Sequence, residues 1–366
     1  MNASAASAAS SVSSLSSVSS EDWARELGIP TAAVELYRST DVIDLHIDSF
    51  IWQRTFGYDL SKRHRAPRFL AGAFLGQVDF PRILQAEISG ATWVITTNPV
   101  REAADRARVF EDNLNELEAT FQRDAAHFQL VKTAREYDAA RAAGKHAAFV
   151  GIQGGNALDL DLSEMARLCD GRVLRITLVH LSSSRIGSTS SPMRLRDSGL
   201  SGFGAQMVEL LNERKVLVDL AHISARGFWA ACEAHAKDVP FVVTHTGVSG
   251  VYRHWRNLDD AQIRAVADSG GVVGIMYHAP FLGDRPWAGR VETVARHLEH
   301  VVKVGGEDSA ALGSDWDGSI ITPRDMPTCL ELPRLVAALL RRGISDTVIQ
   351  KILGRNFLRV VRHVRG

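Results

Sequence analysis

The run Asp44-Leu45-His46-Ile47-Asp48 places an imidazole and a carboxylate two residues apart at the end of an apolar stretch. Residues two apart on a strand point to the same side, so His46 and Asp48 would lie side by side as a two-ligand clip for a metal ion. A polar pair satisfied by backbone groups at a strand end would give the same pattern. The choice between these interpretations depends on whether other strands supply partners.

Later apolar runs also end in polar side chains that suit catalysis or metal binding. These residues are Gln153, His180, His222, His245 and Asp315. Histidine and carboxylate ligands with no partnering cysteine suit zinc or a similar divalent ion. Each residue also has a structural interpretation, since a histidine can be hydrogen-bonded in the core and the segment Gly313–Gly318 is rich in turn-forming Asp and Gly. Independent accidents would not favour the same end of successive strands, so the set as a whole predicts a site.

The runs that carry these residues are short and rich in Val, Ile and Leu on both faces, which is typical of strands in a buried parallel sheet. They are Val42–His46, Ala91–Thr96, Ala147–Gln153, Val173–His180, Lys215–His222, Pro240–Thr246, Gly270–Tyr277 and Ala310–Asp315. The helix-like segments between them include Arg101–Arg123, Gly204–Arg214, Ala225–Ala236, Asp259–Ser269 and Arg290–Val304. Eight strands alternating with helices predict the α/β class and a (β/α)8 barrel, in which catalytic groups collect at the carboxyl ends of the strands.

The two ends of the chain differ in composition. Two helices are expected after the last strand: Leu332–Arg342, with Gly343 as its C-cap, and a second helix that Ser345 caps. The first 20 residues are almost all Ser and Ala and lack the basic and apolar regions of a secretory signal. Because they offer so little apolar surface to bury, we predict a disordered tail over residues 1–20 and a single barrel domain over residues 21–366.

Composition narrows the class of partner. The 366 residues are 45% hydrophobic, and 42 Lys and Arg balance 42 Asp and Glu, so no net field draws in nucleic acid or an anionic membrane surface. No apolar run approaches the roughly 18 to 20 residues that span a bilayer, so we expect a small-molecule partner and neither nucleic acid nor membrane. Cys169, Cys232 and Cys329 match no CxxC pattern and predict reduced thiols in a cytoplasmic protein.

The remaining histidines are expected to lie mostly outside the site. Solvated positions are predicted for those with charged neighbours in helix-like or loop segments: His64, His127, His146, His235, His297, His300 and His363. His254 and His278 each follow a predicted strand and could line a pocket.

Several longer motifs recur in a fixed order along the chain. They are Asp44–Asp48, Gly151–Asn156, Gly199–Gly204, Val218–Ser224, Thr244-His245, Arg256–Asp260, Gly313–Gly318 and Leu353–Val360. In their order and spacing the chain resembles the membrane (renal) dipeptidases and their bacterial relatives, metallopeptidases of the amidohydrolase-like barrel superfamily. The similarity runs from about Val42 to Val360.

The resemblance implies a role for each matching residue. The family's two-zinc site would take His46 and Asp48 for one metal and His222 and His245 for the other. Asp315 matches the catalytic aspartate that handles the proton of the attacking water. Two residues match substrate contacts: His180 at the reaction centre, and Arg256, whose guanidinium would hold the terminal carboxylate. A surface salt bridge of Arg256 with Asp259 or Asp260 is the structural alternative.

The chain departs from the family pattern at one place. The family's metal-bridging glutamate is Gln153 here, and the histidine three residues later is Asn156, a candidate substrate contact. An amide offers one neutral oxygen where a carboxylate offers two oxygens and a charge, and a bridging anion offsets the repulsion between two divalent ions. We therefore expect Gln153 to leave one zinc ion on His46 and Asp48, with Asp315 a candidate third ligand, and a weak or empty second site.

Three functions remain open from the sequence. The first is a metal-dependent hydrolase that cleaves a dipeptide or similar small amide with a free carboxylate by means of metal-activated water. The second is a binding protein with impaired catalysis. The replacement of the family's glutamate and histidine by Gln153 and Asn156 favours this interpretation. The third is a repurposed biosynthetic enzyme acting on a modified amino acid or a non-peptide amide, since the Ser-rich segment Leu181–Arg196 lies where the family places substrate-contacting loops. The resemblance also implies a homodimer.

Overall fold

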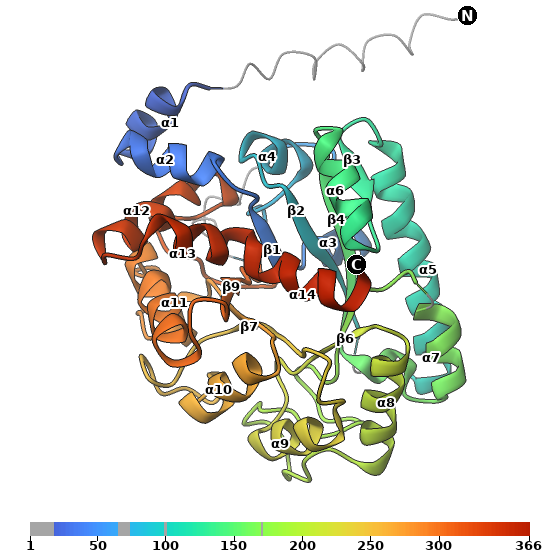
Figure 1. Cartoon of the computed structure of the whole chain (residues 1–366). Helices are drawn as coiled ribbons and strands as arrows, with labels where there is room; N and C mark the ends of the chain where they lie inside the picture. The colour runs from blue at the N-terminus through green and yellow to red at the C-terminus, as the bar shows by residue number, and fades with distance from the viewer. Residues whose placement is uncertain (1–17, 65–73, 99–100, 170) are drawn as a thin grey trace, which may run out of the picture.

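Parallel strands form a barrel in the computed structural model, which describes residues 18–64, 74–98, 101–169 and 171–366 (Figure 1). The strands are β1 (Ile43–Ile47), β2 (Gly90–Thr96), β3 (Phe128–Leu130), β4 (His146–Gln153), β5 (Arg175–Thr177), β6 (Leu217–Asp219), β7 (Val243–Thr246), β8 (Val273–Ile275) and β9 (Ala310–Leu312). Neighbours pair in the order β6-β5-β4-β2-β1-β9-β8-β7, and a bridge between Asp219 and Val242 joins the two ends of this order. The predicted (β/α)8 barrel of the α/β class is confirmed.

Two details of the strands differ from the sequence-based expectation. The short strand β3 was not predicted. It pairs with the first residues of β4, with Phe128 opposite His146, and lies outside the barrel order. Strands β5 and β6 also end three residues before His180 and His222, and β9 likewise ends at Leu312, three residues before Asp315. After β6 the Asp219 carboxylate accepts a hydrogen bond from the backbone of Ala221 at 3.0 Å, which turns the chain out of the sheet. The polar residues therefore lie in loops above these three strands.

Helices surround the barrel (Figure 1). They are α1 (Ser20–Leu27), α2 (Thr31–Arg38), α3 (Phe50–Phe56), α4 (Phe80–Gln85), α5 (Ala103–Arg123), α6 (Ala134–Ala142), α7 (Leu162–Cys169), α8 (Gly202–Glu213), α9 (Ala225–Ala234), α10 (Asp260–Asp268), α11 (Val291–Gly305), α12 (Pro333–Arg341), α13 (Asp346–Gln350) and α14 (Asn356–Arg365). Short 3₁₀ turns are η2 (Gly155–Leu158), η3 (Ala279–Leu282) and η4 (Cys329–Glu331). The five helices predicted between strands are confirmed with boundaries shifted by one or two residues.

Side-chain caps explain where the helices after β5, β6 and β7 begin. Ser201 accepts from the backbone of Gly204 at the start of α8, and Ser224 accepts from Gly227 at the start of α9. Asp259 and Gln262 form a reciprocal capping box at α10. Each cap fixes the end of a loop that carries a candidate site residue, so these hydroxyl and carboxylate groups help to set the loop geometry.

The C-terminal helices close one end of the barrel. Gly343 follows α12 with φ +76°, a left-handed conformation that glycine adopts without strain. Ser345 caps α13 as predicted, and the helix continues through a π-helical turn (Lys351–Arg355) into α14. Phe357 and Leu358 of this segment pack with the buried side chains of Ile43 and Leu45. This packing leaves the carboxyl ends of the strands free for a site.

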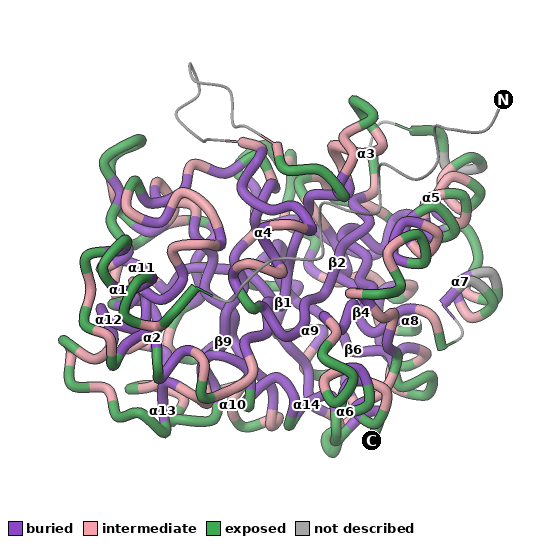
Figure 2. Tube along the Cα trace, turned by 90° about the horizontal axis from the view of Figure 1, so that it is seen from above, coloured by how far each residue is buried: buried purple, intermediate pink, exposed green. Residues whose placement is uncertain are grey.

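The barrel strands are buried on both faces (Figure 2). One face points into the barrel and the other meets the helices, which explains why the strands read as continuous apolar runs. Three histidines that were expected to be solvated are buried instead: His146 on β4 is 2% exposed, His235 after α9 is 8% exposed, and His297 on α11 is fully buried. Of the predicted tail, residues 1–17 lie outside the described residues. Ser20 begins α1, and Ser19 caps it.

Candidate metal and catalytic site

The polar residues singled out in the sequence gather at the carboxyl end of the barrel. A continuous series of contacts joins all of those proposed as metal ligands or catalytic groups: His46, Asp48, Gln153, His180, His222, His245 and Asp315. They come from β1, β4 and β7 and from the loops after β1, β5, β6 and β9. The structure therefore brings together residues up to 269 positions apart in the chain.

The imidazole of His46 lies at the centre of this group. Its ring is fully buried, and its Nε2 has no hydrogen-bond partner. Carboxylate oxygens of Asp48 and Asp315 lie 3.8 and 3.7 Å from Nε2. The ligand atoms of His46, His245 and Asp315 are all within 4.8 Å of one another. An unpartnered buried nitrogen facing two carboxylates and a second imidazole fits one divalent ion.

Gln153 contacts Asp48 directly. The Asp48 carboxylate accepts from the Thr96 hydroxyl at 2.5 Å and from Nε2 of Gln153 at 3.1 Å. Because an ionised carboxylate only accepts, the amide must turn its NH2 toward Asp48. Its oxygen Oε1 is then left buried without a partner. Gln153 therefore offers the centre one neutral oxygen and holds Asp48 in place with its nitrogen.

His222 and His245 face each other through their Nε2 atoms, which lie 2.7 Å apart. Burial lowers the pKa of both rings well below the usual range, and the nearby Arg256 and His46 add to this shift. Both rings are therefore neutral, and one donates to the other. The pair can present two nitrogens to a shared ion, but it brings no negative charge to it.

Arg175 is a buried charge that the sequence analysis missed. It interrupts the apolar run of β5 and is fully buried. Its NH2 donates to Nδ1 of His46 at 2.7 Å, and its NH1 lies 3.0 Å from the Asp219 carboxylate. A guanidinium only donates, so Nδ1 of His46 accepts and the neutral ring carries its proton on Nε2. An ion bound at Nε2 would displace this proton. The charged residue between Leu174 and Ile176 was the signal available in the sequence.

Asp315 has the properties of a carboxyl group that can hold a proton. Its backbone is in the left-handed region with φ +63°, which is uncommon outside glycine and points to a functional constraint. Its side chain is 13% exposed. Burial raises the pKa of Asp315 well above its usual value, and the like charge of Asp48 adds to the increase.

His180 stands at the open side of the group. Its ring is perpendicular to the ring of His222 at a centroid distance of 4.7 Å. Burial lowers the pKa of His180 to about 4, so the ring is neutral at neutral pH. The Ser-rich segment 181–196 holds the backbone of both His180 and His222: the Thr189 hydroxyl donates to the His180 carbonyl at 2.5 Å, and the Ser190 backbone donates to the His222 carbonyl at 2.7 Å.

Arg256 is buried beside this group and is not a surface residue. It is 3% exposed, and its NH2 donates to the carbonyl of His245 at 2.6 Å, while Nε has no hydrogen-bond partner. Asp259 caps α10, and Asp260 pairs with His300 at 2.7 Å. The surface salt bridge considered as an alternative is therefore wrong, and a partly unpartnered buried guanidinium remains for an anionic ligand.

Asn156 occupies a different place. It lies in η2, is 6% exposed, and its backbone carbonyl accepts from Nε of Arg106 at 2.7 Å. This hydrogen bond connects the η2 backbone at Asn156 to α5. A direct contact of the Asn156 side chain with substrate stays a prediction.

Comparison with known proteins identifies the family of the chain. A model of the membrane dipeptidase family, peptidase family M19, matches residues 31–366. The chain belongs to the membrane dipeptidase family. It is therefore an enzyme of the metal-dependent hydrolase class. Within the described residues, no helix combines the length and apolar composition needed to cross a bilayer.

Three proteins to which this membrane dipeptidase family member is similar share 23–37% of their aligned residues with it. An "uncharacterized protein in pqqA 5'region" from Klebsiella pneumoniae is 37% identical over 169 residues, which cover 45% of this chain and only 61% of that relative. The solved structure of dipeptidase AC, an M19 metallopeptidase, is 25% identical with a TM-score of 0.77 and covers 89% of this chain and 99% of that one. The metallopeptidase from Rhodobacter sphaeroides, liganded with a phosphinate mimic of the dipeptide L-Ala-D-Ala, is 23% identical with a TM-score of 0.78 and the same coverage.

Proposed function

We propose that this chain hydrolyses a dipeptide, or a similar small amide with a free carboxylate, in a reaction that depends on one bound zinc ion. The observation that carries the proposal is the unpartnered Nε2 of His46, buried between the carboxylates of Asp48 and Asp315. A bound divalent ion supplies Lewis acidity, which lowers the pKa of a water molecule and polarises a carbonyl. His46, Asp48, Asp315 and His245 are the residues that would hold it.

A single tightly held ion follows from the charges of the donor groups. Asp48 and Asp315 are carboxylates near His46, whereas His222, His245 and the amide oxygen of Gln153 are neutral. Two divalent ions at short distance repel each other strongly unless an anion lies between them. The affinity of a second metal position, at His222 and His245, is therefore low in this chain.

The remaining residues bind substrate and handle protons. Nε of Arg256, buried without a partner, supports recognition of the substrate carboxylate by a guanidinium. His180 is neutral and partly exposed, so it can donate a hydrogen bond to an oxygen on which negative charge develops. The Asp315 carboxylate, 3.7 Å from Nε2 of His46, takes a proton from the attacking water and returns it to the leaving amine.

The dipeptide as substrate class is supported by the family and by one relative. The Rhodobacter sphaeroides metallopeptidase, which shares the fold of this chain, was crystallised with a phosphinate mimic of L-Ala-D-Ala. We also propose a homodimer, on the family resemblance, and a reducing compartment such as the cytoplasm, because Cys169, Cys232 and Cys329 are unpaired. Light scattering after size-exclusion chromatography tests the dimer.

The test of the function starts from metal-free protein. Zinc is added stepwise, and both bound metal and the hydrolysis of a dipeptide panel are measured. Asp315→Asn should lower the rate by at least 100-fold, whereas Asp308→Asn, which removes an exposed carboxylate, should leave it unchanged. Zinc binding without cleavage of any dipeptide would favour a non-peptide amide as substrate. Absence of zinc binding would contradict the proposal itself.

A further inference from the structure

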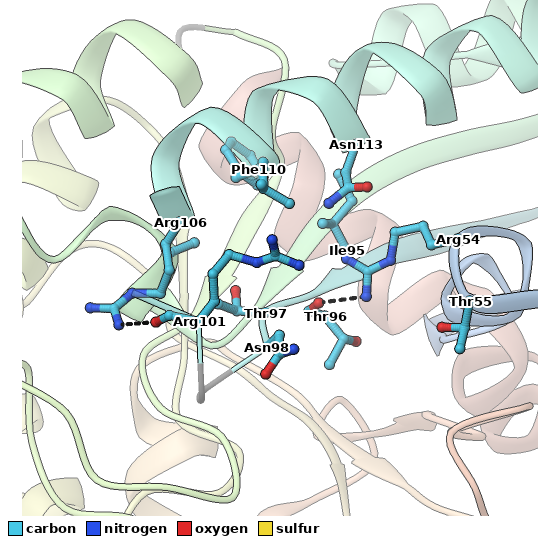
Figure 3. Close-up of a pocket in the computed structure, with 12 residues that line it drawn as sticks. Arg54, Thr55, Ile95, Thr96, Thr97, Asn98, Arg101, Arg106, Phe110 and Asn113 are labelled. Carbon is cyan, nitrogen blue, oxygen red and sulfur yellow. Dashed lines mark hydrogen bonds between the residues drawn. The ribbon is translucent and has the colours of Figure 1, made fainter. Parts of the chain in front are cut away.

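A pocket opens beside the candidate centre, at the carboxyl end of β2 (Figure 3). It has a volume of about 250 Å³, and three arginines line it: Arg54 from α3, Arg101 from the segment before α5, and Arg106 from α5. Figure 3 shows the guanidinium groups of Arg54 and Arg101 directed into the same space. No carboxylate is among the described side chains that line the pocket. The pocket is therefore cationic.

Two of the three arginines, Arg54 and Arg101, form no ion pair with a carboxylate in the described part of the chain. Arg106 pairs with Asp159 at 2.7 Å. Arg54 uses NH2 to donate to the carbonyl of Thr96 at 2.9 Å, but its Nε is buried without a hydrogen-bond partner. Arg101 is exposed at the rim, and no ion pair is formed by it within the described residues. Two like charges facing one cavity, one of them with an unsatisfied buried donor, call for an anion.

The pocket is joined to the candidate centre through β2. The Thr96 carbonyl accepts from Arg54, and the hydroxyl of the same residue donates to Asp48 at 2.5 Å. Thr97 donates from its backbone to the carbonyl of Gln153 at 2.9 Å and from its hydroxyl to that of Gly154 at 2.8 Å. A ligand in the pocket would therefore lie one residue away from the groups that surround the metal position. Arg256, in contrast, contacts the centre from the loop after β7.

We propose that this pocket, with Arg54 and Arg101 as its charged groups, binds an acidic group of the substrate. This inference rests on the proposed function and makes it more specific: the substrate carries a second carboxylate, such as an acidic side chain, besides the one assigned to Arg256. The pocket volume suits a short carboxylate-bearing side chain, and the threonine and asparagine groups at Thr97, Asn98 and Asn113 supply further polar wall. Substrates that differ only in this charge are therefore discriminated.

Arg101 allows a clean test because it is exposed and does not hold other groups through its side chain in the described structure. The zinc-loaded enzyme is assayed with dipeptide pairs that differ only by Glu against Gln, in both residue orders and with both enantiomers. The ratio of kcat/KM within a pair cancels effects on the common chemistry. We expect the natural enzyme to favour the Glu member, and Arg101→Gln to reduce that ratio about tenfold. The matched control is Arg108→Gln, an exposed arginine of α5 outside the pocket that pairs with Asp105 and Asp112.

A binding measurement separates this inference from the proposed function. Calorimetry with glutarate should give a dissociation constant that Arg101→Gln raises about tenfold and Arg108→Gln does not change, while the uncharged glutaramide should not bind. This result would support the acidic subsite even if no dipeptide were cleaved. Equal rates for Glu and Gln dipeptides, or glutarate binding that is insensitive to Arg101→Gln, would overturn it. Binding of inorganic phosphate that depends on Arg101, without a preference for acidic substrates, would also overturn it in favour of an adventitious anion site.

Discussion

Gln153 donates a hydrogen bond from Nε2 to Oδ2 of Asp48 over 3.1 Å. In the family pattern this position is a glutamate, and a glutamate beside Asp48 would place two buried carboxylates against each other without a metal. The amide removes that repulsion, and it also removes the anion that a second ion needs. The contact therefore links the stability of the metal-free centre to the number of ions it holds.

Gln153→Glu is expected to raise the tightly bound zinc from one ion per chain to two, with an increase in dipeptide hydrolysis. Elemental analysis after gel filtration gives the metal content. Gln206→Glu is the matched control, because it adds the same charge at an exposed position of α8. Two tightly bound zinc ions in the natural chain, or only one in Gln153→Glu, would contradict the proposed effect of the amide.

The second prediction concerns Arg175 and Asp219, which form a fully buried ion pair at 3.0 Å. Arg175→Met leaves the Asp219 charge buried without its partner and should lower the free energy of unfolding by about 3–5 kcal/mol. Urea denaturation measures this loss. Arg172→Met is the control, since Arg172 pairs with Glu118 where both side chains are partly exposed, and it should cost less than about 1 kcal/mol.

The pair also allows a double-mutant cycle. Asp219→Asn should recover part of the loss caused by Arg175→Met, because the variant with both changes buries no unpaired charge. A coupling of about 1–3 kcal/mol is expected. Losses that simply add would show that the two charges do not stabilise each other.

The barrel and the gathering of polar side chains at one end of it could be predicted because each rests on a local pattern. Eight residues of sequence are enough to show a strand that is apolar on both faces and ends in a polar residue, as at His46 and Gln153. Contacts that depend on packing between distant segments were not visible. Arg175 reaches His46 across 129 positions, and nothing near Arg54 in sequence indicates the pocket that it lines.

Burial was the other property that local sequence did not reveal. His146 has Lys145 before it and was expected in solvent, but its ring packs against Phe128 of β3 and Trp93 of β2. Both ring nitrogens are satisfied only in the neutral form: Nε2 accepts from Trp93 at 3.1 Å and Nδ1 donates to the Ile88 carbonyl at 2.8 Å.

His146 therefore makes stability depend on pH. Burial lowers the pKa of this ring from 6.5 to about 4, so between these values the unfolded chain binds the proton and the folded chain does not. The contribution of the neutral His146 ring to the free energy of unfolding is complete above pH 6.5. It falls by about 3 kcal/mol as the pH decreases from 6.5 to 4. His146→Gln keeps one donor and one acceptor without titrating. Urea denaturation at several pH values should show a smaller loss on acidification in this variant, and identical profiles would refute the assignment.

The last prediction tests Arg256 as the group that holds the substrate carboxylate. Its NH2 donates to the His245 carbonyl, whereas the buried Nε has no hydrogen-bond partner within the described part of the protein. Arg256→Lys keeps the charge but loses the fork. We expect kcat/KM for a dipeptide to fall about 100-fold while the rate for the same dipeptide with an amidated C-terminus, already low, falls much less. Arg253→Lys, at an exposed position three residues earlier, should change neither rate. An equal fall for both substrates would mean that Arg256 supports the loop after β7 rather than the carboxylate.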